Sequence, residues 1–405
     1  MRILVLLFIV SVFFQTQAVD LKVGTWRGVI DCQGHELPFT FDVVKKDSRL
    51  LVYLKNGAEK IELDEVSVFG DSVKMVLHIF DAELRAKIND NQLTGTFVKN
   101  YAPQANQPFR ATHGENYRFV KNSTEKQTDY SGKYQIEFTN ARGKKIPSVG
   151  LFQQTGNHLT GSFLTPTGDY RYLEGNVVDG TLMLSSFDGN HAYVFIASKK
   201  GDSLKGDYYA GKLTHETFKG IRSEQAKMPD AESLTYLKPG YDKIDFHFPD
   251  LNHKLISPAD DKYKNKVVIL QILGTWCPNC IDETNFLVPW YNTNRKRGVE
   301  IIGLAYERKE DFAYASERVK KMKEKLKVTY DLVIAGTDNT EKASQTLPML
   351  NKIMGFPTTI IIGKDGKVKN IHTGFEGPGT GIYFEQYKER FNQIINELLA
   401  QKGTQ

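Results

Sequence analysis

The chain has 405 residues, of which 40% are hydrophobic and 25% charged, and its formal net charge is +5 at pH 7. So small and evenly spread an excess of positive charge argues against nucleic acid or a membrane surface as a partner. Three cysteines are too few for a disulfide scaffold, and a chain of this length predicts two or three domains.

Residues 1–18 have the pattern of a secretory signal peptide. Arg2 gives the positive start, residues 3–14 form an apolar core, and residues 16–18 read Thr-Gln-Ala, a small-x-small cleavage site. A core of about a dozen apolar residues is too short to span a bilayer, and no later segment is long and apolar enough to do so. We therefore expect an exported chain without a membrane span after cleavage.

Residues 20–222 are rich in short alternating strands, glycine turns and aromatic side chains. They also repeat. Glycine followed two residues later by an aromatic residue starts at Gly24 and again at Gly132, a lag of 108 residues. A Leu-x-Gly-x-aromatic motif starts at Leu93 and again at Leu204, a lag of 111 residues. Matching lags of this size predict two structural repeats.

We expect antiparallel β modules over residues 19–113 and 114–222, which are barrel-like or sandwich-like or join in one larger unit. Trp26 is expected to fill the end of a barrel; the alternative is a module that binds a ligand or docks redox targets. Cys32 is expected to be a buried or idle thiol, and the alternative is a partner in a mixed disulfide. A polar linker, residues 223–240, follows.

From residue 241 onward, apolar strand patterns alternate with helical patterns. Strands are expected at 267–273, 299–305, 330–335, 358–362 and 367–372, and helices at 278–297, 309–326, 341–354 and 383–399. This alternation, which ends in a hairpin and a helix, predicts an α/β domain with a mixed sheet covered by helices.

Residues 276–280 read Trp-Cys-Pro-Asn-Cys and lie where the first of these strands gives way to a helix. At that place unpaired backbone N–H groups and the helix dipole stabilise a thiolate on Cys277. The same spacing occurs in zinc sites, but Cys32 is the only cysteine besides Cys277 and Cys280, and no His-x-x-x-His pattern accompanies them. We therefore predict dithiol–disulfide exchange and no metal site.

Residues 241–405 resemble the thioredoxin-like superfamily and, within it, the TlpA/ResA branch of extracytoplasmic thiol-disulfide oxidoreductases. The resemblance rests on residues 274–280, on Glu283, and on residues 355–359, Gly-Phe-Pro-Thr-Thr, which are similar to the cis-proline loop of this fold. The chain departs from thioredoxin itself at Gln271, where thioredoxin has a buried aspartate.

The position of Cys277 at the helix start makes it the expected nucleophile, which attacks a target disulfide, and Cys280 the thiol that releases the target. The resemblance implies a proton relay by Glu283, one helix turn beyond Cys280, with Glu307 as the alternative. It implies no cofactor. Four residues are expected to line the target groove: Trp276, Phe356, Pro357 and Gly374.

The resemblance also implies a place and a direction. Members of this branch usually reduce disulfides outside the cytoplasm, with electrons from a membrane thiol reductase. We therefore expect a periplasmic reductase whose partners are cysteine-containing target proteins and such a membrane reductase. A disulfide oxidase or isomerase is one alternative, and a ligand-binding β protein whose redox domain acts as a sensor is another. For the compartment, a eukaryotic secretory route is the alternative.

Overall fold

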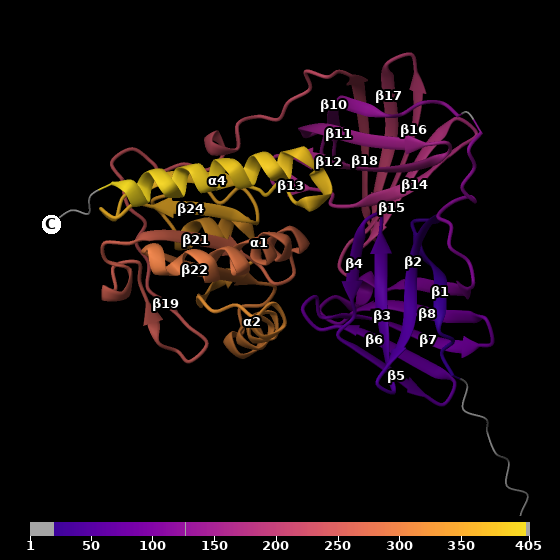
Figure 1. The fold of residues 1–405 in the computed structure, drawn as a ribbon, viewed down its shortest axis with the longest axis horizontal. Coiled ribbons are helices and arrows are strands. Elements are labelled where there is room, and N and C mark those ends of the chain that lie inside the picture. Colours follow the sequence, from indigo (N-terminus) through magenta and orange to yellow (C-terminus); the bar gives the residue numbers. More distant parts are fainter. Residues whose placement is uncertain (1–19, 126, 402–405) are drawn as a thin grey trace, which may run out of the picture.

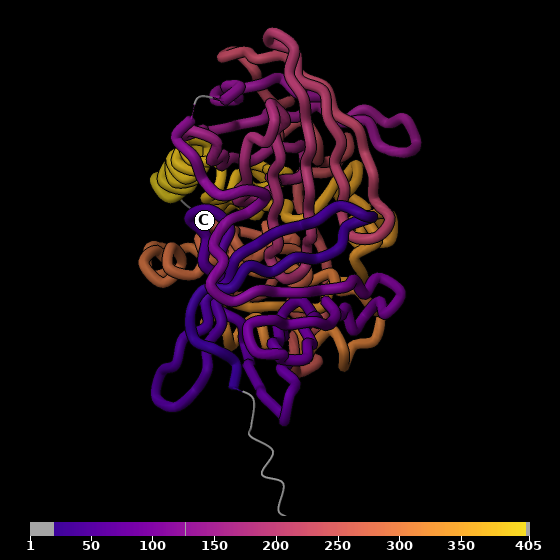
Figure 2. The backbone as a smooth tube through the Cα atoms, turned by 90° about the vertical axis from the view of Figure 1, so that its right-hand side faces the viewer, coloured from indigo at the N-terminus to yellow at the C-terminus, as the bar shows by residue number. Residues whose placement is uncertain are grey.

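The computed structural model describes residues 20–125 and 127–401, so the expected signal peptide, residues 1–18, lies outside the described residues. Figure 1 shows a region made of strands on one side of the molecule and a domain of mixed strands and helices on the other. Seen from the strand-rich side, the β region lies in front of the mixed domain (Figure 2). The two parts are therefore side by side.

The first β module, residues 20–113, is one antiparallel sheet of nine strands in the order β4-β3-β2-β1-β9-β8-β7-β6-β5. Along β2 the alternating residues Phe39, Phe41 and Val43 are buried, as the period of two requires of a strand with one face on the core. Trp26 lies in the same core, its ring 6.1 Å from that of Phe41. The strands are β1 (Gly24–Cys32), β2 (His35–Lys46), β3 (Arg49–Asn56), β4 (Glu59–Glu62), β5 (Glu65–Phe69), β6 (Ser72–Leu77), β7 (Ala82–Asn89), β8 (Gln92–Lys99) and β9 (Gln107–His113).

The second β module, residues 114–222, repeats this strand order and closes it. Its order is β11-β10-β18-β17-β16-β15-β14-β12-β13, and an additional β11–β12 pairing joins eight of the strands in a ring. Aromatic rings such as Phe138, Phe163 and Phe195 fill the barrel. The strands are β10 (Gly132–Thr139), β11 (Lys145–Thr155), β12 (His158–Thr165), β13 (Gly168–Asp169), β14 (Leu173–Val178), β15 (Thr181–Phe187), β16 (Ala192–Lys200), β17 (Ser203–Ala210) and β18 (Thr214–Arg222).

The repeat that the sequence lags indicate is thus present strand for strand. Gly24 and Gly132 begin the first strand of their modules, and both have a positive φ, +127° and +111°, which favours glycine. The expectation of an antiparallel, repeated β region is confirmed. One module is an open half-barrel and the other a closed barrel, an outcome that the sequence patterns left open.

The second module covers the open side of the first. Phe187, at the end of β15, places its ring 4.6 Å from that of Phe39 and 4.9 Å from that of Phe97 in the first module. The Asn56 side chain donates to the Phe187 carbonyl (2.9 Å) and accepts from its N–H (3.2 Å). The aromatic core of the open sheet is therefore completed by a residue of the other module.

The C-terminal domain, residues 241–401, contains the predicted mixed sheet, in the order β23-β22-β21-β24-β25. Strand β21 pairs in parallel with β22 and antiparallel with β24. All seven residues of β21 are buried, which is why its sequence is almost continuously apolar. The strands are β21 (Val267–Leu273), β22 (Val299–Glu307), β23 (Asp331–Thr337), β24 (Thr358–Ile362) and β25 (Val368–Thr373), with a small hairpin of β19 (Phe248–Pro249) and β20 (Leu255–Ile256).

The helices cover this sheet, and one of them is shorter than the sequence pattern indicates. The helix expected over 341–354 ends at Thr346, because Leu347 precedes Pro348 and a residue before proline disfavours helical backbone. Among the described residues, no helix is long and apolar enough to cross a membrane. The α-helices are α1 (Pro278–Asn294), α2 (Phe312–Leu326), α3 (Thr340–Thr346) and α4 (Ile382–Ala400).

Candidate active site

The two cysteines lie where the buried strand β21 ends and helix α1 begins. Cys277 is the N-cap of α1, and its sulfur accepts a hydrogen bond from the Cys280 backbone N–H at 3.2 Å. Pro278 occupies the first turn, where a missing N–H costs no helix bond. A thiolate on Cys277 would therefore face unpaired N–H groups and the positive end of the helix dipole.

Cys280 is fully buried one turn deeper. Burial, followed by the hydrogen bond and charge of Cys277, raises the pKa of the Cys280 thiol well above its usual value. Both cysteines are unbonded in this structure. The pair thus combines an N-capping sulfur with a protonated inner thiol, the asymmetry that stepwise disulfide exchange uses.

The residues expected to form the target groove surround Cys277. The Phe356–Pro357 peptide bond is cis, and the Cys277 thiol donates to the Phe356 carbonyl at 3.6 Å. The Trp276 ring meets Phe356 edge-on, with ring centres 5.5 Å apart. The Gly374 N–H donates to the Pro357 carbonyl at 2.9 Å. The structure therefore gathers all four groove residues; their role in binding targets stays a prediction.

Glu283 points from α1 into the protein interior. One carboxylate oxygen accepts from the Thr359 hydroxyl (2.6 Å), and the other accepts from the Gln271 amide (2.9 Å). Burial raises the pKa of Glu283, and the negative charge of Glu283 contributes to raising the pKa of Cys280. Gln271 of β21 stands where thioredoxin has its aspartate. Here its amide orients the carboxylate of Glu283, which comes from helix α1.

A second buried carboxylate, Glu307 at the end of β22, holds the turn before the cysteines. Its oxygens accept from the Thr275 backbone N–H (2.8 Å) and from the Thr275 hydroxyl (2.7 Å). Burial raises the pKa of Glu307 to about 7. Glu283 thus lies on the interior side of the cysteine pair, and Glu307 holds Thr275, two residues before Cys277, in place.

The β region reaches the same site, and no sequence pattern pointed to the residues that do so. The Asn190 side chain donates to the Trp276 carbonyl at 2.9 Å, and the Asn279 side chain donates to the Asp169 carbonyl at 3.1 Å. Asn190 lies in a turn and Asp169 in the two-residue strand β13, and they are 86 and 110 positions from their partners, so local periodicity carries no signal for these contacts.

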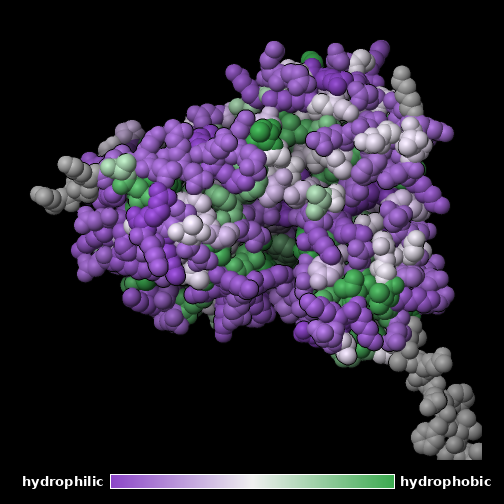
Figure 3. Space-filling view, in the orientation of Figure 1, coloured by the Kyte–Doolittle hydropathy of each residue, from purple (hydrophilic) through white to green (hydrophobic). Residues whose placement is uncertain are grey.

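Beside this contact a cleft of about 390 Å³ opens between the two parts of the molecule. The first β module contributes Glu59 and Phe80, the second contributes Arg171, and α1 contributes Ile281 and Asp282. Figure 3 shows the molecular face hollowed where the two parts meet, with hydrophobic residues at the floor of the hollow.

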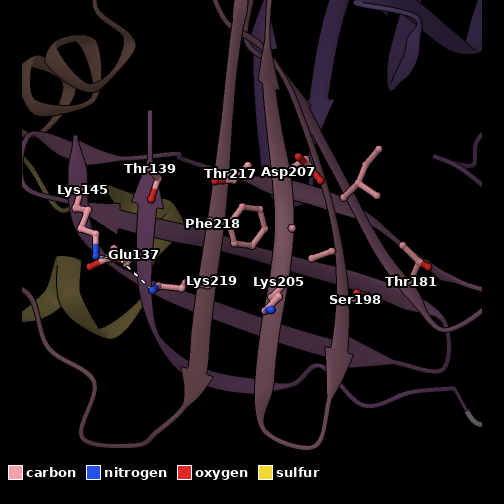
Figure 4. Close-up of a pocket in the computed structure, with 13 residues that line it drawn as sticks. Glu137, Thr139, Lys145, Thr181, Ser198, Lys205, Asp207, Thr217, Phe218 and Lys219 are labelled. Carbon is pink, nitrogen blue, oxygen red and sulfur yellow. Dashed lines mark ion pairs between the residues drawn. The ribbon is translucent and has the colours of Figure 1, made fainter. Parts of the chain in front are cut away.

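A larger hollow, of about 550 Å³, lies on the second β module and has no residue of the C-terminal domain in its lining. Figure 4 shows Glu137 between Lys145 and Lys219, with which it forms ion pairs of 3.1 and 3.5 Å. Because the charges of this hollow are paired and it lies away from α1, we assign it no role in thiol chemistry. Within residues 20–125 and 127–401, no group of three or more potential ligands is arranged to hold a metal ion.

Comparisons with known proteins agree with this geometry. The profile of the Redoxin family matches residues 224–387. Thiol-disulfide oxidoreductase ResA of Geobacillus thermodenitrificans is 32% identical over 130 residues, which are 32% of this chain and 66% of that protein, slightly under two thirds of its length. ResA of Bacillus thuringiensis subsp. konkukian is 30% identical over 159 residues, 39% of this chain and 78% of that protein.

A solved thiol:disulfide interchange protein of the thioredoxin family, from Chlorobium tepidum, covers 39% of this chain and 96% of its own, with 22% identity and a TM-score of 0.31. The matched residues 224–387 include the cysteine pair, both buried carboxylates and the loop around Pro357. Since a ResA protein is 30% identical to this chain over 78% of its own length, the chain belongs, through its C-terminal domain, to the ResA-type thiol-disulfide oxidoreductases.

Proposed function

We propose that the protein is an exported thiol-disulfide oxidoreductase whose Cys277/Cys280 pair reduces disulfides in periplasmic protein targets. The observation that carries this proposal is the placement of the Cys277 sulfur at the N-cap of α1, with the Cys280 thiol one turn behind it. The names of the ResA relatives support the reaction class. The signal-peptide pattern of residues 1–18 supports export.

The reaction proceeds in two displacements. The Cys277 thiolate attacks one sulfur of a target disulfide; the target S–S bond breaks, a mixed disulfide forms, and the departing target sulfur takes up a proton. Cys280 then loses its proton and attacks the Cys277 sulfur, which releases the second target thiol. The target has gained two electrons, and the protein holds a Cys277–Cys280 disulfide. A dithiol donor, which we propose to be a membrane thiol reductase, restores the pair.

Glu283 is the proposed acceptor of the Cys280 proton. A thiol with a raised pKa needs a base before it can attack, and the nearby buried carboxylate has a raised pKa of its own, so it takes up a proton more readily than an exposed glutamate does. The hydroxyl of Tyr387, 3.4 Å from the carboxylate, helps hold it towards the interior.

The test is insulin reduction by the mature protein with a dithiol donor. We expect turnover that Cys277→Ser abolishes, and Cys280→Ser should accumulate mixed disulfides with targets, whereas Cys277→Ser should not. Cys32→Ser is the matched control, because Cys32 is buried in the first β module against the Gly211 carbonyl (3.3 Å). Mixed disulfides at Cys280 instead of Cys277 would reverse the assignment.

The reduction potential of the Cys277/Cys280 pair tells whether the protein acts as a reductase or as an oxidase. A value near about −270 mV supports a reductase, and one near about −120 mV supports an oxidase.

A second candidate function is a ligand-binding β protein whose redox domain is a sensor, and the observation that favours it is the burial of Cys277 beside the β region. Absence of turnover with any dithiol donor would select that candidate.

A further inference from the structure

Cys277, the proposed nucleophile, is largely shielded from solvent. Only 6% of the Cys277 surface is exposed. An attack on a disulfide of another protein needs an open, in-line approach to this sulfur. The residues on both sides of Cys277 are bonded to the β region: the Trp276 carbonyl accepts from Asn190, and the Asn279 side chain donates to the Asp169 carbonyl. The cover is therefore supplied by the chain itself.

One turn of the second β module fills the space beside the cis-proline loop. This turn, residues 166–169, consists of the two residues after β12 and the short strand β13. It passes Gly374 so closely that an added Cβ there would lie 2.8 Å from the Gly168 nitrogen and 3.3 Å from the Pro166 carbonyl oxygen. A Cβ on Gly355 would lie 2.6 Å from the Thr167 side chain. Gly374 thus permits a close fit to the backbone of the turn, and Gly355 leaves room for the Thr167 side chain.

The turn is also hydrogen-bonded to the loop that follows the groove. The Gly377 N–H donates to the Asp169 carboxylate at 2.7 Å, and Asp169 is 8% exposed. A hydrogen bond from a backbone N–H to a buried carboxylate is among the stronger kinds. The 166–169 turn therefore packs closely against the loop around Gly374 and Gly377 and shares a buried hydrogen bond with it.

A second turn holds the other side of the site. Asn190, in the turn between β15 and β16, accepts with its side-chain oxygen from Arg308 (3.2 Å) and from the Tyr101 hydroxyl (3.1 Å) while its amide group holds the Trp276 carbonyl. The Arg308 guanidinium lies over the rings of Tyr101 (3.8 Å) and Trp276 (5.1 Å). Both β modules therefore take part in closing the site.

Ion pairs also join the two parts away from the groove: Arg171 pairs with Asp282 of α1 at 3.0 Å, and Arg318 of α2 pairs with Asp81 of the first module at 3.4 Å. The chain crosses from the β region to the C-terminal domain through the linker, whose first part is bonded to the second module (Ser223 N–H to the Lys133 carbonyl) and whose last part is bonded to the C-terminal domain (Lys238 N–H to the Met349 carbonyl). Between these anchors, residues 229–232 are mostly exposed. Once the contacts between the two parts break, rotation in this short segment would move them apart.

We propose that the 166–169 turn occupies the groove for the target peptide, so that the β region is a built-in lid which a protein target must displace before Cys277 can react. This inference rests on the proposed function, because it concerns the access of a protein disulfide to Cys277. The lid favours targets that compete for the groove with their own backbone, and it shields the thiol from other bulky disulfides.

The experiment measures access to Cys277 by alkylation, which requires no turnover. In a Cys32→Ala, Cys280→Ser background of the full chain, Cys277 is the single thiol. The rate with a maleimide on a polyethylene glycol chain is divided by the rate with a small maleimide. Asp169→Ala removes the bond from the Gly377 N–H, Asn190→Ala removes the bonds with the Trp276 carbonyl and Arg308, and Asp169→Asn keeps the shape and an acceptor oxygen. Asp207→Ala, at a surface ion pair with His215, is the control.

We expect the ratio to rise about tenfold in Asp169→Ala, which corresponds to about 1.4 kcal/mol for the loss of one strong hydrogen bond, and at least as much in Asn190→Ala, which loses two bonds to the C-terminal domain. Asp169→Asn and Asp207→Ala should leave the ratio near that of the parent. An unchanged ratio in both alanine variants, or an equal rise in Asp207→Ala, would overturn the lid. Failure of insulin reduction with a raised ratio would overturn the proposed function and leave the lid standing.

Discussion

Replacing Glu307 by glutamine should stabilise the protein, and the gain should depend on pH. Glu307 is 1% exposed, and burial raises its pKa from 4.5 to about 7. Glutamine has the same shape: its carbonyl oxygen can accept from the Thr275 N–H, and its amide can donate to the Thr275 hydroxyl. Both hydrogen bonds are therefore kept, and the substitution removes only the charge.

The sign follows from proton binding. Because the pKa of Glu307 is higher in the folded state than in the unfolded chain, the wild-type protein loses stability as the pH rises from about 4.5 to about 7. The difference between 7 and 4.5, at about 1.4 kcal/mol for each pH unit, amounts to about 3 kcal/mol. The glutamine variant does not suffer this loss. Its advantage should be about 3 kcal/mol at pH 8 and below about 0.5 kcal/mol at pH 4.

Urea unfolding followed by the helical circular dichroism signal measures this difference, because the described α-helices all lie in the C-terminal domain. The control is Glu310→Gln, at a surface ion pair with Lys342, where the pKa of the carboxyl is lowered and no gain is expected at pH 8. A gain for Glu307→Gln that is equal at both pH values, or absent at pH 8, would refute the reasoning.

Three further predictions concern the redox pair, the domains and the core. Glu283→Gln should slow release of a reduced protein target about 100-fold and change the pH profile of Cys277 alkylation, with a smaller effect on the reaction of a small reagent; unchanged values would exclude the relay. Residues 241–405 alone should fold and exchange disulfides, because no strand of their sheet comes from the β region; loss of near-ultraviolet dichroism would contradict this. Phe187→Ala should cost about 3–5 kcal/mol, measured by unfolding that exposes Trp26.

Much of the C-terminal domain follows from short stretches of sequence. The run over β21, seven buried residues, is apolar because both faces of the strand are covered, and the cysteine pair follows it directly. The position of Glu283 one turn beyond Cys280 placed it on the inner side of α1, where it is buried. The early end of α3 was also encoded locally, in Pro348, and the apolar periodicity beyond it concealed that signal.

What the sequence does not encode locally is which edges of the sheets meet. Both modules carry the same strand order, and only the second closes, through the pairing of β12 with β14, whose equivalent between β3 and β5 is not among the pairings of the first sheet. Closure depends on the twist and length of whole sheets, which strand patterns do not record. The contacts of Asn190 and Asp169 with the redox turn likewise depend on how finished modules dock.

The repeat itself explains how the β region reaches the redox helix. Strand order makes β4 of the first module equivalent to β13 of the second, and both lie beside α1: Glu59 of β4 and Asp282 of α1 each pair with Arg171, which follows β13. The copies differ at this place, since β4 has four residues and β13 only two. Because β13 is short, the 166–169 turn keeps only two residues paired with β12, and it reaches the groove beside Gly374. The asymmetry between the modules thus lies where the C-terminal domain docks.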